Sequence, residues 1–172
     1  MVETLLSMAR MESGQVAITR QTVALDEIVS EYLESAAEQV NAKHLKIQFD
    51  RKPCELETDA NKIDLVIRNI LDNAITHSLQ SSAVAISTST RGNQAELTVT
   101  NTAQDSQNLD ADQIFERFWQ ADSSRHSTGS HFGLGLPLSR KIVEFLNGKI
   151  QAEIDGEEFT MRISLPLTPP TA

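Results

Sequence analysis

The chain has 172 residues and a formal net charge of −9, with 40% hydrophobic and 23% charged residues. This composition is typical of a globular domain that is long enough to bury a core. An acidic chain repels phosphate backbones, and its Lys and Arg residues form no cluster, so we expect no nucleic acid partner. The single cysteine, Cys54, excludes an internal disulfide and a zinc site of the Cys/His type. No apolar run approaches 18 residues, so we expect neither a membrane span nor direct membrane contact.

The first half of the chain predicts two helices and two short strands. Apolar residues repeat at three and four over 25–40 and over 60–77, which predicts two amphipathic helices. Thr58 or Asp59 is placed to cap the second of these helices. Between the helices, "LKIQFD" alternates like a half-buried strand, and "ELETD" predicts a second short strand. A short extended piece is expected around 16–18.

The second half predicts four strands, one helix and a long polar loop. "AVAISTSTR" and "QAELTVTN" read as strands joined by a tight turn at Gly92 and Asn93. Residues 102–132 are mostly polar, and loops of this length are typically lids, binding loops or disordered segments. Pro137 suits the first turn of a helix, after which "KIQAEI" and "FTMRISL" read as strands. The order of elements predicts an α+β domain with a mixed sheet and helices on one face, followed by a disordered tail at 168–172.

Asn69, Asn73, Thr76 and His77 form a polar row at the edge of the apolar face of helix 60–77. Amide oxygens are neutral, hard ligands of the kind that Mg²⁺ accepts, with phosphate oxygens and water completing its coordination. The spacing fits a solvated helix face equally well.

The glycines of Gly133-Leu134-Gly135 precede a helix start, where free backbone N–H groups attract phosphate. A plain tight turn would show the same pattern, and the dinucleotide fingerprint is excluded because its third glycine is missing. Upstream, the aromatic residues of "IFERFW" could pin the long loop to the body as a lid, or form a small satellite cluster.

Taken in chain order, these stretches resemble the ATP-binding catalytic domain of sensor histidine kinases, in the wider family that includes gyrase, Hsp90 and MutL. "NILDNAITHS" is similar to the family's N box, and "VTNTAQD" lies where its G1 box is expected. "IFERFWQADSSR" is similar to the F box, "HFGLGLPLSRKIVEFLNGKI" to the G2 box with its helix, and "FTMRISLPL" to the last strand. The resemblance runs from about residue 22 to residue 167 and is specific, because four boxes stand in the right order.

The resemblance implies a two-layer α/β sandwich, the Bergerat-type ATP-binding fold, with a mixed five-stranded sheet and three helices on one face. It implies that residues 1–14 end the second helix of a dimerisation and phosphoacceptor domain. Residues 15–167 would be the ATP-binding catalytic domain, with a lid at about 102–132. The implied cofactors are ATP and Mg²⁺.

The resemblance also implies the roles of single residues. Asn73 would be a ligand of Mg²⁺, Asn69 would assist it or contact phosphate, and Arg125 would reach the γ-phosphate. These three are the residues that we expect to act in catalysis. The other expected nucleotide contacts are His77, Asn101, Ala103, His131, Phe132, Gly133, Leu134, Gly135 and Leu136.

Several positions depart from the family pattern. The G1 box has Asn101 where the family has Asp, although an amide oxygen can still accept a bond from the adenine amino group and its NH₂ could donate to a ring nitrogen. Ala103 and Asp105 replace two glycines, and Thr76 and Gln120 stand where cations are usual. We therefore expect weaker nucleotide binding than in a relative with the full motif.

The function implied is transfer of the ATP γ-phosphate to a histidine on an upstream domain, for relay to a response regulator. None of the four histidines present lies in an acceptor box, so we expect the chain alone to bind nucleotide without autophosphorylating. The complete protein is expected to be a homodimer, with this part a cytoplasmic domain of a bacterial inner-membrane sensor of the heavy-metal type. Two alternatives stay open. One is a degenerate module that regulates the kinase/phosphatase balance, and the other is a gyrase-type ATPase with Asp72 as its general base.

Overall fold

A computed structural model describes residues 17–103, 110–119 and 133–168 of the chain. Its centre is a five-stranded sheet in the order β2-β4-β5-β7-β6. β2 runs parallel to β4, and the other neighbours are antiparallel, so the predicted mixed sheet is confirmed. The strands are β2 (Lys46–Asp50), β4 (Ala83–Arg91), β5 (Gln94–Thr102), β6 (Lys149–Asp155) and β7 (Glu158–Pro166).

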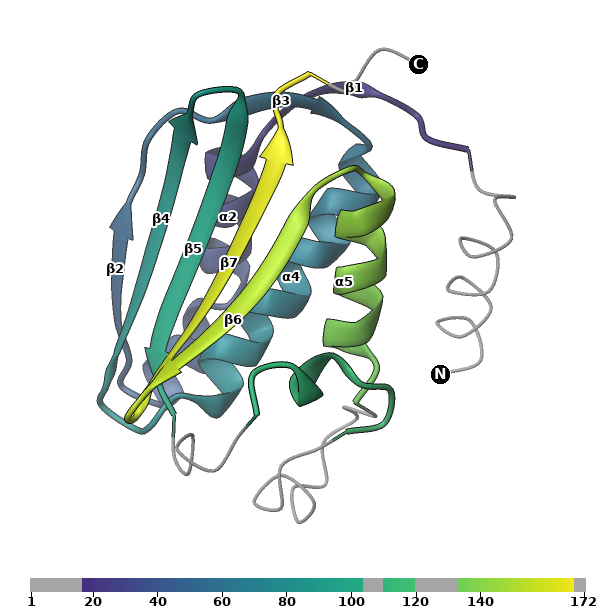
Figure 1. Ribbon diagram of the computed structural model, residues 1–172. Coiled ribbons are helices and arrows are strands. Elements are labelled where there is room, and N and C mark those ends of the chain that lie inside the picture. The colour runs from purple at the N-terminus through teal and green to yellow at the C-terminus, as the bar shows by residue number, and fades with distance from the viewer. Residues whose placement is uncertain (1–16, 104–109, 120–132, 169–172) are drawn as a thin grey trace.

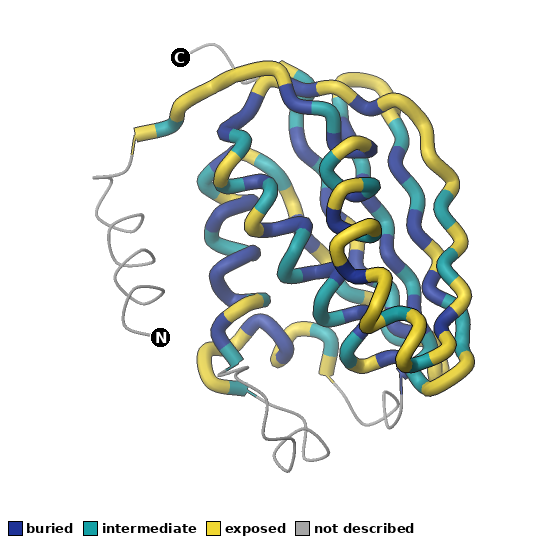
Figure 2. Tube along the Cα trace, turned by 180° about the vertical axis from the view of Figure 1, so that it is seen from behind, coloured by how far each residue is buried: buried dark blue, intermediate teal, exposed yellow. Residues whose placement is uncertain are grey.

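Three helices cover one face of this sheet, as the α+β sandwich predicts (Figure 1). They are α2 (Leu25–Ser35), α4 (Ala60–His77) and α5 (Gly135–Phe145). Inward-facing residues of β4, β5 and β7 alternate with more exposed ones, and α4 turns a stripe of buried Ile, Leu and Val side chains toward them. Figure 2 shows the helices from behind, with buried positions on one side of each and exposed positions on the other.

The helix predicted over 25–40 is two helices, because the chain breaks at Ala36 between α2 and α3 (Ala37–Ala42). The backbone N–H of Ala36 still bonds to the carbonyl of Tyr32 at 2.9 Å, but its ψ of 3° ends the α2 geometry. Periodicity could not show this break, because small and apolar residues continue across it.

A separate two-stranded antiparallel sheet is formed by β1 (Gln21–Ala24) and β3 (Glu55–Thr58). β3 was predicted. β1 was missed because Val23 is its only buried residue, so that no alternation marks it in the sequence. No regular strand forms at 17–18, where an extended piece was expected. The tight turn at Gly92 and Asn93 is confirmed, with Gly92 at a φ of +58°.

Three element ends come together at the lower end of the molecule in Figure 1. They are the C-terminal turn of α4, the end of β5 and the start of α5. An isolated antiparallel bridge joins Ser78, just after α4, to Ala103, just after β5. Next to it the N–H of Leu79 donates to the carbonyl of Thr102 at 2.9 Å. These ends bring together residues from three of the predicted boxes.

Candidate functional site

The N-terminal end of α4 is fixed by Asp59, which confirms one of the two predicted caps. Its carboxylate accepts the N–H of Lys62 at 3.2 Å and the N–H of Thr19 at 3.0 Å, and it pairs with Lys62 Nζ at 2.6 Å. Burial alone would raise the pKa of Asp59, but these donors outweigh it and hold the pKa below its ordinary value. The start of the helix is thus locked to the body.

Asn69 joins the middle of α4 to the start of α5. Its Nδ2 donates to the carbonyl of Gly135 at 3.3 Å and lies 3.2 Å from Ser139 Oγ. These partners are 66 and 70 residues away in sequence, so the contact brings the predicted N box and G2 box together. Because its NH₂ group is engaged, Oδ1 is the atom that Asn69 can offer to a ligand.

The rest of the polar row follows Asn69 toward the end of α4. Asn73 and Thr76 are half-buried, and His77, the last residue of the helix, is exposed. Thr76 Oγ1 accepts a bond from Gln39 Nε2 of α3 at 3.3 Å. The row therefore borders the core as the helical wheel predicted, with α3 beside its last turn.

Asn101 is the most unusual polar residue of this end. It lies near the end of β5 between Val84 of β4 and Phe159 of β7, and its side chain faces the helices. Only 2% of the residue is exposed, and neither Oδ1 nor Nδ2 has a partner within the described part of the chain. An unpaired buried amide costs on the order of 1–3 kcal/mol, so this carboxamide is a candidate for contact with a polar ligand.

Ala103 lies two residues further along the chain and is also buried, with 6% exposed. Its N–H donates to the carbonyl of Glu157 at 2.9 Å, and its backbone forms the bridge to Ser78. The chain at Ala103 is therefore held from both sides.

The two glycines of "GLG" have different structural reasons. Gly133 has a φ of +64°, and a Cβ there would lie 2.5 Å from the carbonyl oxygen of Trp119. Its own carbonyl accepts the N–H of Phe118 at 3.0 Å. Gly135 has no such backbone constraint, and its Cβ would make an ordinary 3.6 Å contact with Asn69 Cγ. Gly133 is thus needed by the turn, whereas Gly135 keeps the helix start open beside Asn69.

Leu134 and Leu136 flank Gly135 at the start of α5. Leu134 is the buried N-cap residue, and its carbonyl accepts the N–H of Leu138 at 3.0 Å. Leu136 is half-buried and packs against the core. Both side chains therefore anchor the helix start.

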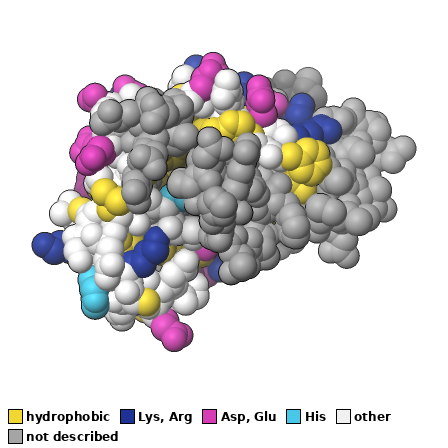
Figure 3. All heavy atoms as spheres, turned by 90° about the horizontal axis from the view of Figure 1, so that it is seen from below, with side chains coloured by type: hydrophobic (Ala, Val, Ile, Leu, Met, Phe, Trp, Pro, Cys, Tyr) yellow, Lys and Arg dark blue, Asp and Glu magenta, His cyan; other side chains and the backbone are white. Residues whose placement is uncertain are grey.

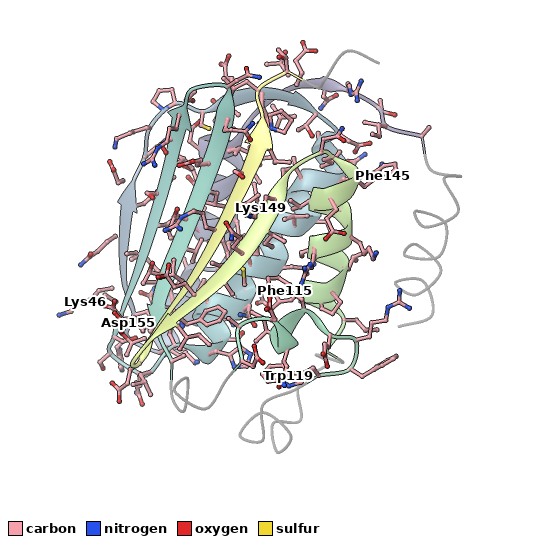
Figure 4. All side chains as sticks on the ribbon, in the orientation of Figure 1. Lys46, Phe115, Trp119, Phe145, Lys149 and Asp155 are labelled. Atoms are coloured by element: carbon pink, nitrogen blue, oxygen red, sulfur yellow. The ribbon has the colours of Figure 1, made fainter. Side chains whose placement is uncertain are left out.

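Residues 110–119 pass beneath α5 in Figure 4, which labels Phe115 and Trp119 in this segment. It contains a short 3₁₀ helix, η2 (Gln113–Phe115). Phe115 is buried with Arg140 stacked 5.1 Å from its ring centroid, and Trp119 packs against the core. These two aromatics pin the segment to the body, as predicted, whereas Phe118 is 58% exposed.

The sequence analysis missed one member of this arrangement, Ser139. It is fully buried on α5 and bonds to Asn69. The signal available in the sequence was that Ser139 is a polar residue on the apolar side of a predicted helix. Arg125, His131 and Phe132 lie outside the described residues and stay predictions, as do the roles expected for Asp105 and Gln120.

Comparison with known proteins decides the family. Residues 58–169, more than half of the chain, match the family model of the histidine kinase-, DNA gyrase B-, and HSP90-like ATPases. The chain belongs to this ATPase family. The expected resemblance is confirmed over the boxes from the N box to the last strand.

Among sensor proteins, the ATPase domain is 28% identical over 171 residues to the sensor protein DltS of Streptococcus agalactiae. The match covers 97% of this chain and 42% of DltS, so the chain spans less than half of that relative. The fold is similar to that of the Acinetobacter baumannii histidine kinase AdeS, with a TM-score of 0.76 and 21% identity over 96% of this chain and 76% of AdeS. It is also similar to full-length ShkA in complex with AMPPNP, with a TM-score of 0.79 and 17% identity over 99% of this chain and 36% of ShkA. These similarities show the fold, and the chain is an ATPase domain of the histidine kinase-, DNA gyrase B-, and HSP90-like family.

Asp72 of the ATPase domain contacts α2. Its Oδ1 accepts a long 3.5 Å bond from the Tyr32 hydroxyl. Burial, and then the charge of Asp72, raise the pKa of Tyr32 above its ordinary value. A general base for water would have to face the nucleotide, so this contact argues against the gyrase-type alternative.

Away from the polar row, the described ranges also contain hollows on the open face of the sheet. A hollow of about 480 Å³ lies on the open face of the sheet, lined largely by short polar side chains of β2, β4 and β5, and not at the polar row. Figure 3 views the lower end, where acidic side chains lie mostly at the periphery and a few Lys and Arg side chains are scattered over the surface. Among the described residues, no three His, Cys, Asp or Glu are grouped to hold a metal ion. No helix in these ranges is both long and apolar enough to cross a bilayer.

Proposed function

We propose that this ATPase domain binds Mg-ATP at the end where α4, β5 and α5 meet, and presents the γ-phosphate to a histidine on another domain. The observation that carries the proposal is the buried carboxamide of Asn101, whose two polar atoms lack partners within the described part of the chain. It lies at the same end as the polar row of α4 and the N-terminus of α5.

The chemistry of these residues fits a purine nucleotide. Asn101 Oδ1 would accept from the adenine amino group, and its Nδ2 would donate to a ring nitrogen. The N-terminus of α5 favours negative charge, and the lack of a side chain at Gly135 keeps its backbone accessible to phosphate. His77, Ala103 and the segment of 102–132, acting as a lid, would complete the pocket.

The amide oxygens of Asn73 and Asn69 fit Mg²⁺, because both are neutral oxygen donors on one edge of α4. The ion needs few protein ligands when phosphate oxygens and water supply the rest. Bound Mg²⁺ neutralises part of the triphosphate charge. Arg125 would contact the γ-phosphate, and His131 and Phe132 would contribute from the predicted lid.

We further propose that residues 1–14 end the second helix of a dimerisation and phosphoacceptor domain and that residues 15–167 form the catalytic domain. The comparison with DltS supports a longer protein, since the match covers 42% of that sensor. The complete protein would be a homodimeric bacterial inner-membrane sensor with this domain in the cytoplasm, and a response regulator would receive the phosphate. Phosphoryl transfer depends on positioning and charge, and the acceptor imidazole is itself a nucleophile, so no base is required from this domain.

Within the described ranges, no observation favours the degenerate regulatory module. The substitutions at Asn101 and Ala103 leave a buried donor and acceptor pair and a well-held backbone. Both features are compatible with binding a base.

The test is transfer of label from γ-labelled ATP. The chain is incubated alone, and then with the separately purified helical domain of the complete protein. Label is expected on the helical domain only, and only when both parts are present. Label on this chain by itself would contradict the proposed acceptor.

A further inference from the structure

Lys43, just after α3, holds the C-terminal end of α4. Its Nζ donates to the carbonyls of Ile75 and Ser78, each at 3.2 Å, and also to the carbonyl of Thr76. The backbone of Lys43 binds the same segment, because its carbonyl accepts the N–H of Ser81 at 2.9 Å. Lys43 thus bonds to four residues between positions 75 and 81, around the end of this helix.

These contacts meet a specific need of the helix. The last carbonyls of an α-helix have no partner within the helix, and they form the negative pole of its dipole. An ammonium group satisfies several of them and offsets that pole. Lys43 is half-buried, and burial lowers the pKa of its ammonium below the ordinary value. The ammonium group of Lys43 is therefore partly desolvated and lies against the carbonyls at the end of the helix.

The turn that Lys43 holds carries the end of the polar row. Thr76 and His77 belong to it, and Asn73 lies one turn earlier. Immediately after it, Ser78 is bridged to Ala103 and the Leu79 N–H is bonded to Thr102, which ties the turn to the end of β5 near Asn101. A shift of this turn would therefore move both sides of the proposed pocket.

We propose that Lys43 is a positioning residue of the nucleotide site, which fixes the last turn of α4 against the end of β5 and offsets the negative pole of that helix. The inference rests on the proposed function and deepens it. Lys43 would act through Asn73, His77 and Asn101 and would not touch the nucleotide itself.

Lys62 provides a matched control on the same helix. It is also a lysine in a partly buried network, with its Nζ 2.6 Å from Asp59 Oδ2 and 17% of its side chain exposed. It serves the first turn of α4, at the opposite end from the polar row. A loss of stability alone would affect both lysine variants in the same way.

The experiment titrates AMPPNP with Mg²⁺ into the unchanged chain and into Lys43→Met, Lys43→Arg and Lys62→Met, at a temperature well below every unfolding midpoint. Lys43→Met is expected to weaken binding about tenfold or more, as outer contacts of a site typically do. Lys43→Arg, which keeps charge and donors, is expected to recover affinity to within about threefold. Lys62→Met is expected to lower the melting temperature and leave affinity within about twofold.

Hydrogen exchange of the backbone amides of 74–78 adds a local measurement. Exchange there should speed up in Lys43→Met and stay unchanged in Lys62→Met. Should Lys43→Met fail to fold, Lys43→Gln replaces it, since a glutamine keeps one donor without the charge, and the same ordering of affinities is expected.

Affinity within about twofold of the unchanged chain for a folded Lys43→Met or Lys43→Gln would overturn the inference. Equal losses in the Lys43 and Lys62 variants would overturn it too. If the unchanged chain binds and Asn73→Ala does not, the proposed function stands and only the role of Lys43 is at stake. Absence of binding by the unchanged chain would overturn both.

Discussion

The N-terminal and C-terminal halves of α4 have different roles, although both have the same helical backbone geometry. At its N-terminus, Asp59 accepts the backbone N–H of Lys62 and pairs with the Lys62 ammonium group. The polar groups of both residues are therefore satisfied within the fold. Toward its C-terminus, Asn69 bonds to the start of α5 and Asn73 follows one turn later on α4, while the buried amide of Asn101 at the same end of the molecule lacks partners in the described part of the chain. Polar groups whose bonds are satisfied within the chain stabilise a fold, while those held in place with capacity to spare point to a ligand.

The largest effect is expected at Asn73. Asn73→Ala should weaken binding of the Mg²⁺ complex of an ATP analogue by about 100-fold, because it removes a proposed ligand oxygen. Asn61→Ala is the control, since Asn61 is exposed in the first turn of the same helix. Fluorescence titration of both variants would show whether the two halves differ. Equal affinities of Asn73→Ala and Asn61→Ala would remove the functional distinction between the two halves of α4.

Asp59→Ala should act on stability and leave binding intact. The loss of a nearly buried cap and ion pair is expected to lower the free energy of unfolding by about 2 kcal/mol, as measured by urea denaturation. Nucleotide affinity well below the melting temperature should not change. A large loss of affinity in a folded Asp59→Ala would show that the N-terminal half also shapes the site.

The pH dependence of stability follows from the same carboxylate. The folded state holds the pKa of Asp59 below its ordinary value of 3.8, so Asp59 stabilises the fold above that value. This contribution should be lost as the pH falls through the lowered pKa. Unfolding experiments from about pH 6 to about pH 2 should show less acid sensitivity in Asp59→Asn than in the unchanged chain. An identical pH profile in the two proteins would contradict the assigned shift.

The glycines before α5 give a smaller contrast within one motif. Gly133→Ala should destabilise the domain by about 1–2 kcal/mol, because its φ is positive and its Cβ would meet the Trp119 carbonyl. Gly135→Ala should change stability by less than about 0.5 kcal/mol, since its Cβ makes only an ordinary contact. Thermal unfolding of both variants would test this order. Equal destabilisation would mean that the two glycines have the same role.

One substitution is expected to increase the stability of the domain. Asn101→Val removes two unpaired buried polar atoms and places a β-branched residue in a strand, which should stabilise the unliganded domain by about 1 kcal/mol. The same variant should lose nucleotide binding. A stable variant without binding would locate Asn101 in the site, whereas a destabilised one would show that its amide already serves the fold.

Much of this fold could be predicted because its elements carry strong periodic signals. The polar row of α4 was visible on a helical wheel, and the hairpin at Gly92 was visible from its turn residues. The break at Ala36 could not be predicted, because it does not interrupt the pattern of apolar residues. The strand β1 could not be predicted either, because it sets up no such pattern. Local sequence thus predicts elements better than the places where they stop.

The site was predicted in part for the same reason. The sequence showed Asn69 and Gly135 as separate motifs, and their contact across 66 residues could come only from the fold. Lys43 carried no signal at all, since its three side-chain contacts are to backbone carbonyls of a distant helix. The burial of Asn101 and its lack of partners within the described residues could be found only in the packed structure.

The central claim is that the end where α4, β5 and α5 meet binds a magnesium nucleotide. The most direct measurement is a calorimetric titration of the unchanged chain with AMPPNP, in the presence of Mg²⁺ and again with excess EDTA. The account predicts saturable one-site binding with Mg²⁺ that weakens strongly when the ion is removed. No detectable binding with Mg²⁺ would contradict it and would make the degenerate regulatory module the better description of this domain.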